Sequence, residues 1–186
     1  MSTAKHILVI DVEATCWENL PPNTFPESRN EIIEIGITRI DIATKDIIDS
    51  NSILVRPPTT EINEFCTRLT TLTPEMVQSQ GVSFLEAIDV LRTTYRSDRN
   101  VWASWGDYDR RSFEKNCRWN SVNYPFVNMH LNVKSLFAAQ YGWNGGLEKC
   151  ATSLGIPFEG TPHRGVDDSR VIARILQTFL KTPSLS

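Results

Sequence analysis

The sequence lacks any uninterrupted apolar run of the roughly 18 residues that a membrane-spanning helix needs, so we expect no transmembrane segment. Residues 1–5 lack the apolar stretch of a secretory signal peptide. The four cysteines are scattered without a Cys-x-x-Cys pair, which argues against a zinc site or a disulfide framework and favours reduced thiols. Together these absences predict a cytoplasmic protein with no membrane contact.

An excess of positive charge is also missing. The formal net charge is −3 at pH 7, which argues against a broad nucleic-acid footprint, although a protein that grips only a chain end would not need one. The 186 residues are enough for one full hydrophobic core. We therefore predict a single domain over residues 1–186, with its core at about 5–181.

The stretch Ile7–Glu13 is the feature around which the chain is organised. Its first four residues, 7–10, are all apolar, which is typical of a strand that is buried on both faces. Because side chains alternate along a strand, Asp11 and Glu13 are expected to point the same way. Two like charges at the end of a buried strand repel each other, and a divalent cation bound between them is the simplest way to offset this repulsion.

The other patterns predict helices and strands in alternation. Apolar spacing indicates strands near 32–40 and 47–55, joined by a short polar turn, and two later strands near 101–105 and 127–131. The proline-rich segment 14–29 reads as a loop. Caps and helical spacing predict helices near 61–69, from 74, from 84, and over 107–118, 133–141, 147–154 and 165–181. This order favours a mixed sheet with helices packed on it.

Two further acids are expected to face inward. Asp168 lies three and four residues before the first apolar positions of the last predicted helix, so it falls on the buried side. Asp109 lies four residues before Phe113 and shares its face by the same spacing. His163 stands five residues before Asp168, where a loop can turn its ring toward the same place. Burying a charged carboxylate costs several kcal/mol, so an inward acid needs a partner whose interaction offsets that cost.

These residues match a known pattern. The set Asp11-x-Glu13, Asp109 and His163-x-x-x-x-Asp168 resembles the DEDDh (DnaQ-like) 3′-to-5′ exonucleases. The segments 11–16, 31–34, 64–70 and 162–169 are similar to the branch of enhanced-RNAi and histone-mRNA 3′ exonucleases. The resemblance implies an RNase H-like α/β fold, a five-stranded mixed sheet flanked by helices.

The resemblance also implies the chemistry. Asp11, Glu13, Asp109 and Asp168 would hold two divalent ions, Mg²⁺ or Mn²⁺, and His163 would be the general base in releasing nucleoside 5′-monophosphates. Four carboxylates carry the charge that two divalent cations cancel, and such a pair of ions suits displacement at phosphorus. Imidazole side chains titrate close to neutral pH, as a base for water requires.

Substrate binding is assigned to four residues, Ala14, Thr15, Trp17 and Tyr108. Tyr108 stands where the similar enzymes tend to carry Trp just before the third acid, and an aromatic ring there can stack on the terminal base. The expected partner is nucleic acid, a single-stranded RNA 3′ end or 3′ overhang, with DNA as an alternative. Whether the protein has protein partners is left open by the sequence.

Other interpretations stay open. Each acid taken alone is also typical of a loop or a helix start. Seven of the nineteen Lys and Arg fall in residues 92–118 and could guide a nucleic-acid backbone, but interleaved acids equally suit solvated helix faces. The alternatives for the whole chain are a proofreading-like 3′-to-5′ exodeoxyribonuclease and a non-catalytic nucleic-acid-binding module.

Overall fold

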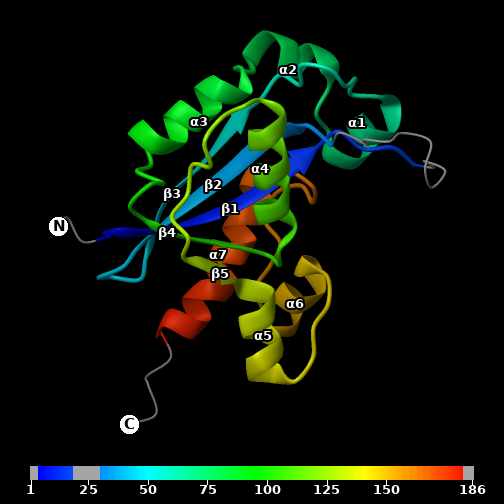
Figure 1. The fold of residues 1–186 in the computed structure, drawn as a ribbon. Helices are drawn as coiled ribbons and strands as arrows, with labels where there is room; N and C mark the ends of the chain where they lie inside the picture. The colour runs from blue at the N-terminus through cyan, green and yellow to red at the C-terminus, as the bar shows by residue number, and fades with distance from the viewer. Residues whose placement is uncertain (1–3, 19–29, 182–186) are drawn as a thin grey trace.

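The protein is described by a computed structural model covering residues 4–18 and 30–181 (Figure 1). Its five strands form one sheet in the order β3-β2-β1-β4-β5. The first three strands pair antiparallel, whereas β1–β4 and β4–β5 pair parallel, so the predicted mixed sheet is confirmed. The strands are β1 (His6–Ala14), β2 (Ile32–Asp41), β3 (Ile47–Leu54), β4 (Val101–Ser104) and β5 (His130–Asn132).

Seven helices are present in the described residues. Several begin where local signals predicted, because Thr73 caps one of them and Ser83 with Glu86 forms a capping box on the next. The helices are α1 (Glu64–Thr70), α2 (Pro74–Gln80), α3 (Phe84–Thr93), α4 (Tyr108–Trp119), α5 (Val133–Tyr141), α6 (Leu147–Ser153) and α7 (Gly165–Lys181).

Strand β1 lies at the centre and is buried on both faces. Leu8 and Ile10 belong to the core cluster that contains residues of α3 and α4, whereas Ile7 and Val9 belong to the cluster that contains residues of α5, α6 and α7. Odd-numbered side chains of β1 therefore face α7. The strand continues into Asp11, and this parity aims that acid at the start of the same helix.

The last strand differs from its predicted position. β5 covers His130–Asn132, not residues 127–131. Val127, the first residue of the predicted strand, packs against the core cluster next to Phe126, which stacks on Trp102 with ring centroids 4.4 Å apart. An apolar run can pack on a sheet as well as extend it. Most of the predicted loop, residues 19–29, lies outside the described residues.

None of the helices in the described part of the chain combines the length and the apolar character needed to cross a bilayer.

Candidate active site

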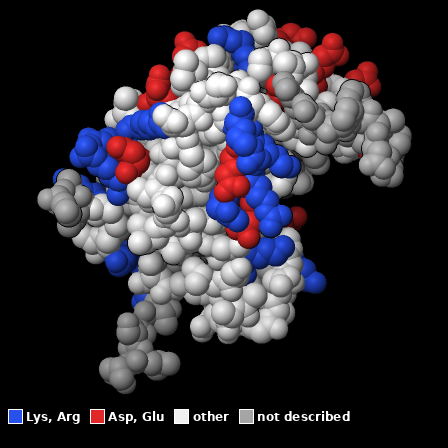
Figure 2. Space-filling view, in the orientation of Figure 1, with Lys and Arg blue, Asp and Glu red and all other residues white. Residues whose placement is uncertain are grey.

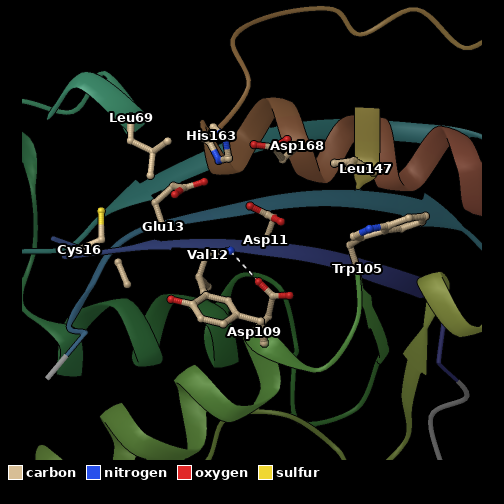
Figure 3. Close-up of a pocket in the computed structure, with 12 residues that line it drawn as sticks. Asp11, Val12, Glu13, Cys16, Leu69, Trp105, Asp109, Leu147, His163 and Asp168 are labelled. Atoms are coloured by element: carbon tan, nitrogen blue, oxygen red, sulfur yellow. Dashed lines mark hydrogen bonds between the residues drawn. The ribbon is translucent and has the colours of Figure 1, made fainter. Parts of the chain in front are cut away.

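Three acids meet at the point where β1 passes beneath the start of α7. Asp11, Glu13 and Asp168 each offer a carboxylate oxygen, and these oxygens lie within 4.8 Å of one another. Figure 3 shows the two β1 side chains pointing toward Asp168, which projects from the helix above them. The convergence predicted from strand parity and helical spacing is therefore present in the structure.

Helix α7 comes this close because two glycines face each other. Gly36 of β2 pairs with Asp11 in the β1–β2 ladder. A Cβ atom added at Gly36 would lie 1.9 Å from the carbonyl carbon and oxygen of Gly165, and one added at Gly165 would lie 2.9 Å from the carbonyl oxygen of Asp11. Backbone thus packs on backbone at the first turn of α7, which brings Asp168 down to the strand.

Asp109 joins the site from the opposite side of β1. It lies in the first turn of α4, is 3% exposed, and accepts a hydrogen bond of 2.9 Å from the backbone N–H of Val12. Strand β4 pairs with β1 only as far as Val9, so Asp109 satisfies a donor beyond the end of that ladder. Its carboxylate lines the same pocket but lies outside the group of three oxygens.

His163 stands at the rim of the site, in the turn that precedes α7. Its side chain is exposed and lines the pocket, and Figure 3 shows it beside Asp168 and above Glu13. Its φ of 61° is left-handed, a conformation that non-glycine residues adopt at some expense and often at functional sites. The backbone N–H of His163 donates to the Asp168 carboxylate, which ties the turn to the helix.

The carboxyl groups of the site hold their protons more tightly than ordinary acids. Burial, reinforced by the neighbouring acids, raises the pKa of Asp11 well above its usual value and that of Glu13 to about 8. Burial raises the pKa of Asp168 to about 7. Burial also raises the pKa of Asp109 to about 6, although the hydrogen bond from Val12 acts to lower it.

Such a set of buried and half-buried carboxylates favours the binding of positive charge. Oxygen ligands from several carboxylates are what hard divalent cations such as Mg²⁺ and Mn²⁺ bind. Arg164 is the one cation among the causes acting on Glu13, and its effect is outweighed by burial and the other acids. The residues present therefore fit a divalent-metal centre.

The pocket around these acids has a volume of about 310 Å³. Two of the four residues assigned to substrate binding, Ala14 and Tyr108, line it, and Tyr108 is 55% exposed. Thr15 and Trp17 are not among the lining residues. The Thr15 side chain is fully buried, with its Oγ 3.0 Å from that of Thr60, so its assignment to substrate binding stays a prediction that the side chain itself does not support.

The reason for the difference at Thr15 is a break in the strand. The β1–β2 register shifts between Glu13 and Ala14, which interrupts the simple alternation of faces. Ala14 consequently lines the pocket, whereas Thr15 points into the structure and accepts a hydrogen bond from the backbone N–H of Glu31. Five residues of the pocket wall were not predicted from the sequence, namely Val12, Cys16, Leu69, Trp105 and Leu147.

Glu34 is a further residue whose part in the site was missed. It lies opposite Glu13 in the β1–β2 ladder and is completely buried. It accepts hydrogen bonds from Ser52 Oγ at 2.6 Å, from the backbone N–H of Gly165 at 2.9 Å, and from Arg164 Nε and Nη2 at 3.2 and 3.3 Å. Glu34 therefore fixes the first residues of α7 against β2.

This arrangement is an acid-rich centre on the central strand of a mixed sheet, open to solvent on one side. A family model described as "Exonuclease" matches residues 8–176, and the chain belongs to this exonuclease family. The sequence is 30% identical over 190 residues to the 3′-5′ exoribonuclease 1 of Homo sapiens, covering 95% of this chain and 52% of that protein. The chain thus spans about half the length of this relative.

Two solved structures agree with the assignment. The nuclease domain of 3′hExo, described as a DEDDh family member bound to rAMP, superposes with a TM-score of 0.83 at 28% identity, covering 97% of this chain and 94% of that one. A 3′-exonuclease that recognises the 3′ end of the histone mRNA stem-loop gives a TM-score of 0.82 at 27% identity, covering 97% and 84%. The RNase H-like fold and the DEDDh relationship predicted from the motifs are confirmed.

Proposed function

We propose that this chain is a metal-dependent 3′-to-5′ exoribonuclease that releases nucleoside 5′-monophosphates from RNA 3′ ends. The observation that carries the proposal is the meeting of Asp11, Glu13 and Asp168 within 4.8 Å in a pocket that Asp109 and His163 also line. Membership of the exonuclease family supports hydrolysis, and the exoribonuclease relative and the rAMP-bound domain support RNA as the substrate.

In this proposal the four acids hold two divalent ions, Mg²⁺ or Mn²⁺. Bound there, the ions supply Lewis-acid stabilisation of the charge that develops on the phosphate oxygens. Asp11, Glu13 and Asp168 can share one ligand set because their oxygens are already close. Asp109, held by Val12, contributes from the other side of β1. Release of their protons on loading is expected from their raised pKa values.

His163 acts as the general base. Its exposed imidazole faces the acid cluster and solvent together, so it can accept a proton from an attacking water and pass it to bulk solvent (Figure 3). The left-handed turn and its hydrogen bond to Asp168 hold the residue over the site. Substituting the imidazole should therefore slow turnover without removing the acid cluster.

The terminal nucleotide is proposed to lie between two walls of the pocket. Tyr108 at the start of α4 offers an aromatic face, and Leu69 at the end of α1 is a partly exposed apolar residue that also lines the pocket. Stacking on an aromatic ring is worth about 1–3 kcal/mol per base and tolerates any sequence. Ala14, small and buried, lets the nucleotide approach β1 closely. A contact from Trp17 stays a prediction.

The test is release of mononucleotides from a 3′-overhang RNA in Mg²⁺ or Mn²⁺. We expect turnover that EDTA abolishes and that Asp168→Asn removes, since this change takes one carboxylate from the cluster. Asp89→Asn, the same change on the exposed face of α3, should retain the activity. Tight RNA binding without turnover in either metal would contradict the proposal and indicate a binding module.

A DNA strand of the same sequence tests the alternative that the preferred substrate is DNA. Equal or faster hydrolysis of DNA would contradict the RNA preference while leaving the exonuclease chemistry intact, because selection for RNA rests on contacts to the 2′-hydroxyl.

A further inference from the structure

Three cations of α4 lie on one side of the helix, in line with a residue of the pocket. Arg111, Lys115 and Arg118 follow one another at spacings of four and three residues, and all three are exposed. At about 100° per residue, they fall with Tyr108 within roughly 80° of arc around the helix. We call Arg111, Lys115 and Arg118 the α4 basic strip.

The strip leads away from the pocket. Tyr108 lines the pocket at the N-terminus of α4, and the buried face, which carries Asp109 and Phe113, is turned to the core. With a rise of 1.5 Å per residue, Arg111 and Lys115 begin about 4.5 and 10.5 Å beyond Tyr108 along the axis. A strand whose last base rests on Tyr108 can therefore continue over the strip.

The acids that interleave with these cations do not neutralise them. Asp107 and Glu114 both pair with Arg110, with distances of 3.3 and 3.0 Å between nitrogen and oxygen. Within residues 4–18 and 30–181, no ion pair joins a member of the strip to an acid. Figure 2 shows the resulting column of Lys and Arg over α4, with the few acids beside it.

Because the chain as a whole has a net charge of −3, this row of unpaired cations is a local concentration of positive charge. Three like charges within two turns of helix repel one another, and an anion with regularly repeated charges relieves that repulsion. The backbone of a nucleic acid has this character, and Lys and Arg on an exposed helix face reach it without reading sequence.

We propose that the α4 basic strip binds the phosphate backbone of the substrate strand on the 5′ side of its terminal nucleotide. The proposal rests on the proposed function for the direction of the strand. It makes affinity depend on the length of the RNA, which a protein that grips only the last nucleotide would not show.

The experiment compares two variants that each lose two positive charges. Arg111→Gln/Lys115→Gln alters the strip, and Arg96→Gln/Arg99→Gln alters exposed residues just before β4, at the end of that strand away from the pocket. The dissociation constant of a labelled 20-nucleotide RNA is measured by fluorescence anisotropy in EDTA, where no cleavage occurs, over a series of salt concentrations.

We expect the strip variant to bind the 20-mer about fivefold more weakly at low salt, the effect of losing two exposed ion pairs. The slope of log K against log salt should become less steep by about 1.4, or 0.7 for each phosphate contact on a single strand. The Arg96/Arg99 variant should bind within twofold of the wild type. Equal affinity and equal slope in the two variants would overturn the proposal.

Kinetics then separate this proposal from the proposed function. In Mg²⁺ the strip variant should show a raised KM for the 20-mer and a smaller change for a dinucleotide, which is too short to reach Lys115. A wild-type protein that cleaves neither substrate refutes the exonuclease function, whereas the anisotropy result still decides whether the strip binds RNA.

Discussion

The contact between Gly36 and Gly165 allows a sharp prediction about the site. Replacing Gly36 by Ala places a methyl group 1.9 Å from the backbone of Gly165, whereas ordinary contacts begin at 3.4 Å. The first turn of α7 would therefore have to retreat by about 1.5 Å. Asp168 and His163 move with it, while Asp11, paired with Gly36 on the sheet, stays behind.

The expected effect on catalysis is large. A misplacement of about 1 Å in a catalytic group can lower the rate by about 100-fold, so we expect kcat of Gly36→Ala to fall by at least that factor. The stability effect is that of an overpacked core, about 1–3 kcal/mol, which corresponds to a fall in Tm of roughly 2–12 °C for a domain of this size. Catalysis should suffer more than folding.

The assay pairs mononucleotide release from RNA with thermal unfolding in the same buffer. Gly146→Ala is the matched control, because a Cβ atom there meets nothing within 4 Å, and we expect kcat within threefold of wild type. As Gly146 caps α6, the control should change stability by no more than about 1 kcal/mol. If Gly36→Ala keeps kcat and Tm at the values of the control, the close approach of α7 does not set the geometry of the site.

Three other predictions concern charge in the site. Glu34→Gln should lower both kcat and Tm, because it leaves Arg164 without its carboxylate partner and frees the start of α7; a circular dichroism melt and a rate measurement that both match wild type would contradict this role. His163→Ala should reduce turnover by about 100-fold or more while Mn²⁺ binding by calorimetry is unchanged, and loss of metal binding would make the assignment of a base wrong. In EDTA, the free energy of unfolding should fall as the pH rises from about 5 to 8.5. The reason is that folding raises the pKa values of Glu13 and Asp168 to about 8 and 7. Their contribution to stability is therefore complete below the pKa values of the unfolded chain and is lost as they ionise in the folded protein. Mn²⁺ should restore stability most at the alkaline end, and a metal-free protein whose stability is flat over this range would refute the buried-acid interpretation.

Local pattern was enough to find the acids of the site. Asp11 and Glu13 could be placed on one face because a strand has a period of two, and Asp109 and Asp168 because a helix has one of 3.6. Each rule needs only a few neighbouring residues. The structure brings these side chains into one pocket, as the spacing predicted.

The features that were not predicted depend on contacts between residues far apart in the sequence or on irregular backbone. Thr15 was expected at the substrate, but the irregularity after Glu13 turns its side chain inward, and such a break has no clear signature in an apolar strand. Glu34 could be recognised only as part of a motif. Its partner Arg164 lies 130 positions away, and a contact at that separation is fixed by the packing of α7 on β2. The start of β5 at His130 instead of Val127 was likewise decided by tertiary packing, because Val127 packs against the core cluster.

Helix α7 supplies the last components of a centre whose first components are made more than 150 positions earlier. During synthesis the ribosome delivers β1 with Asp11 and Glu13 long before Asp168 exists. An unfinished chain therefore has no complete catalytic centre, and under the proposed function it cannot degrade the messenger that encodes it. Under the same proposal, RNA cleavage would begin only after α7 has been synthesised and has packed on β1 and β2.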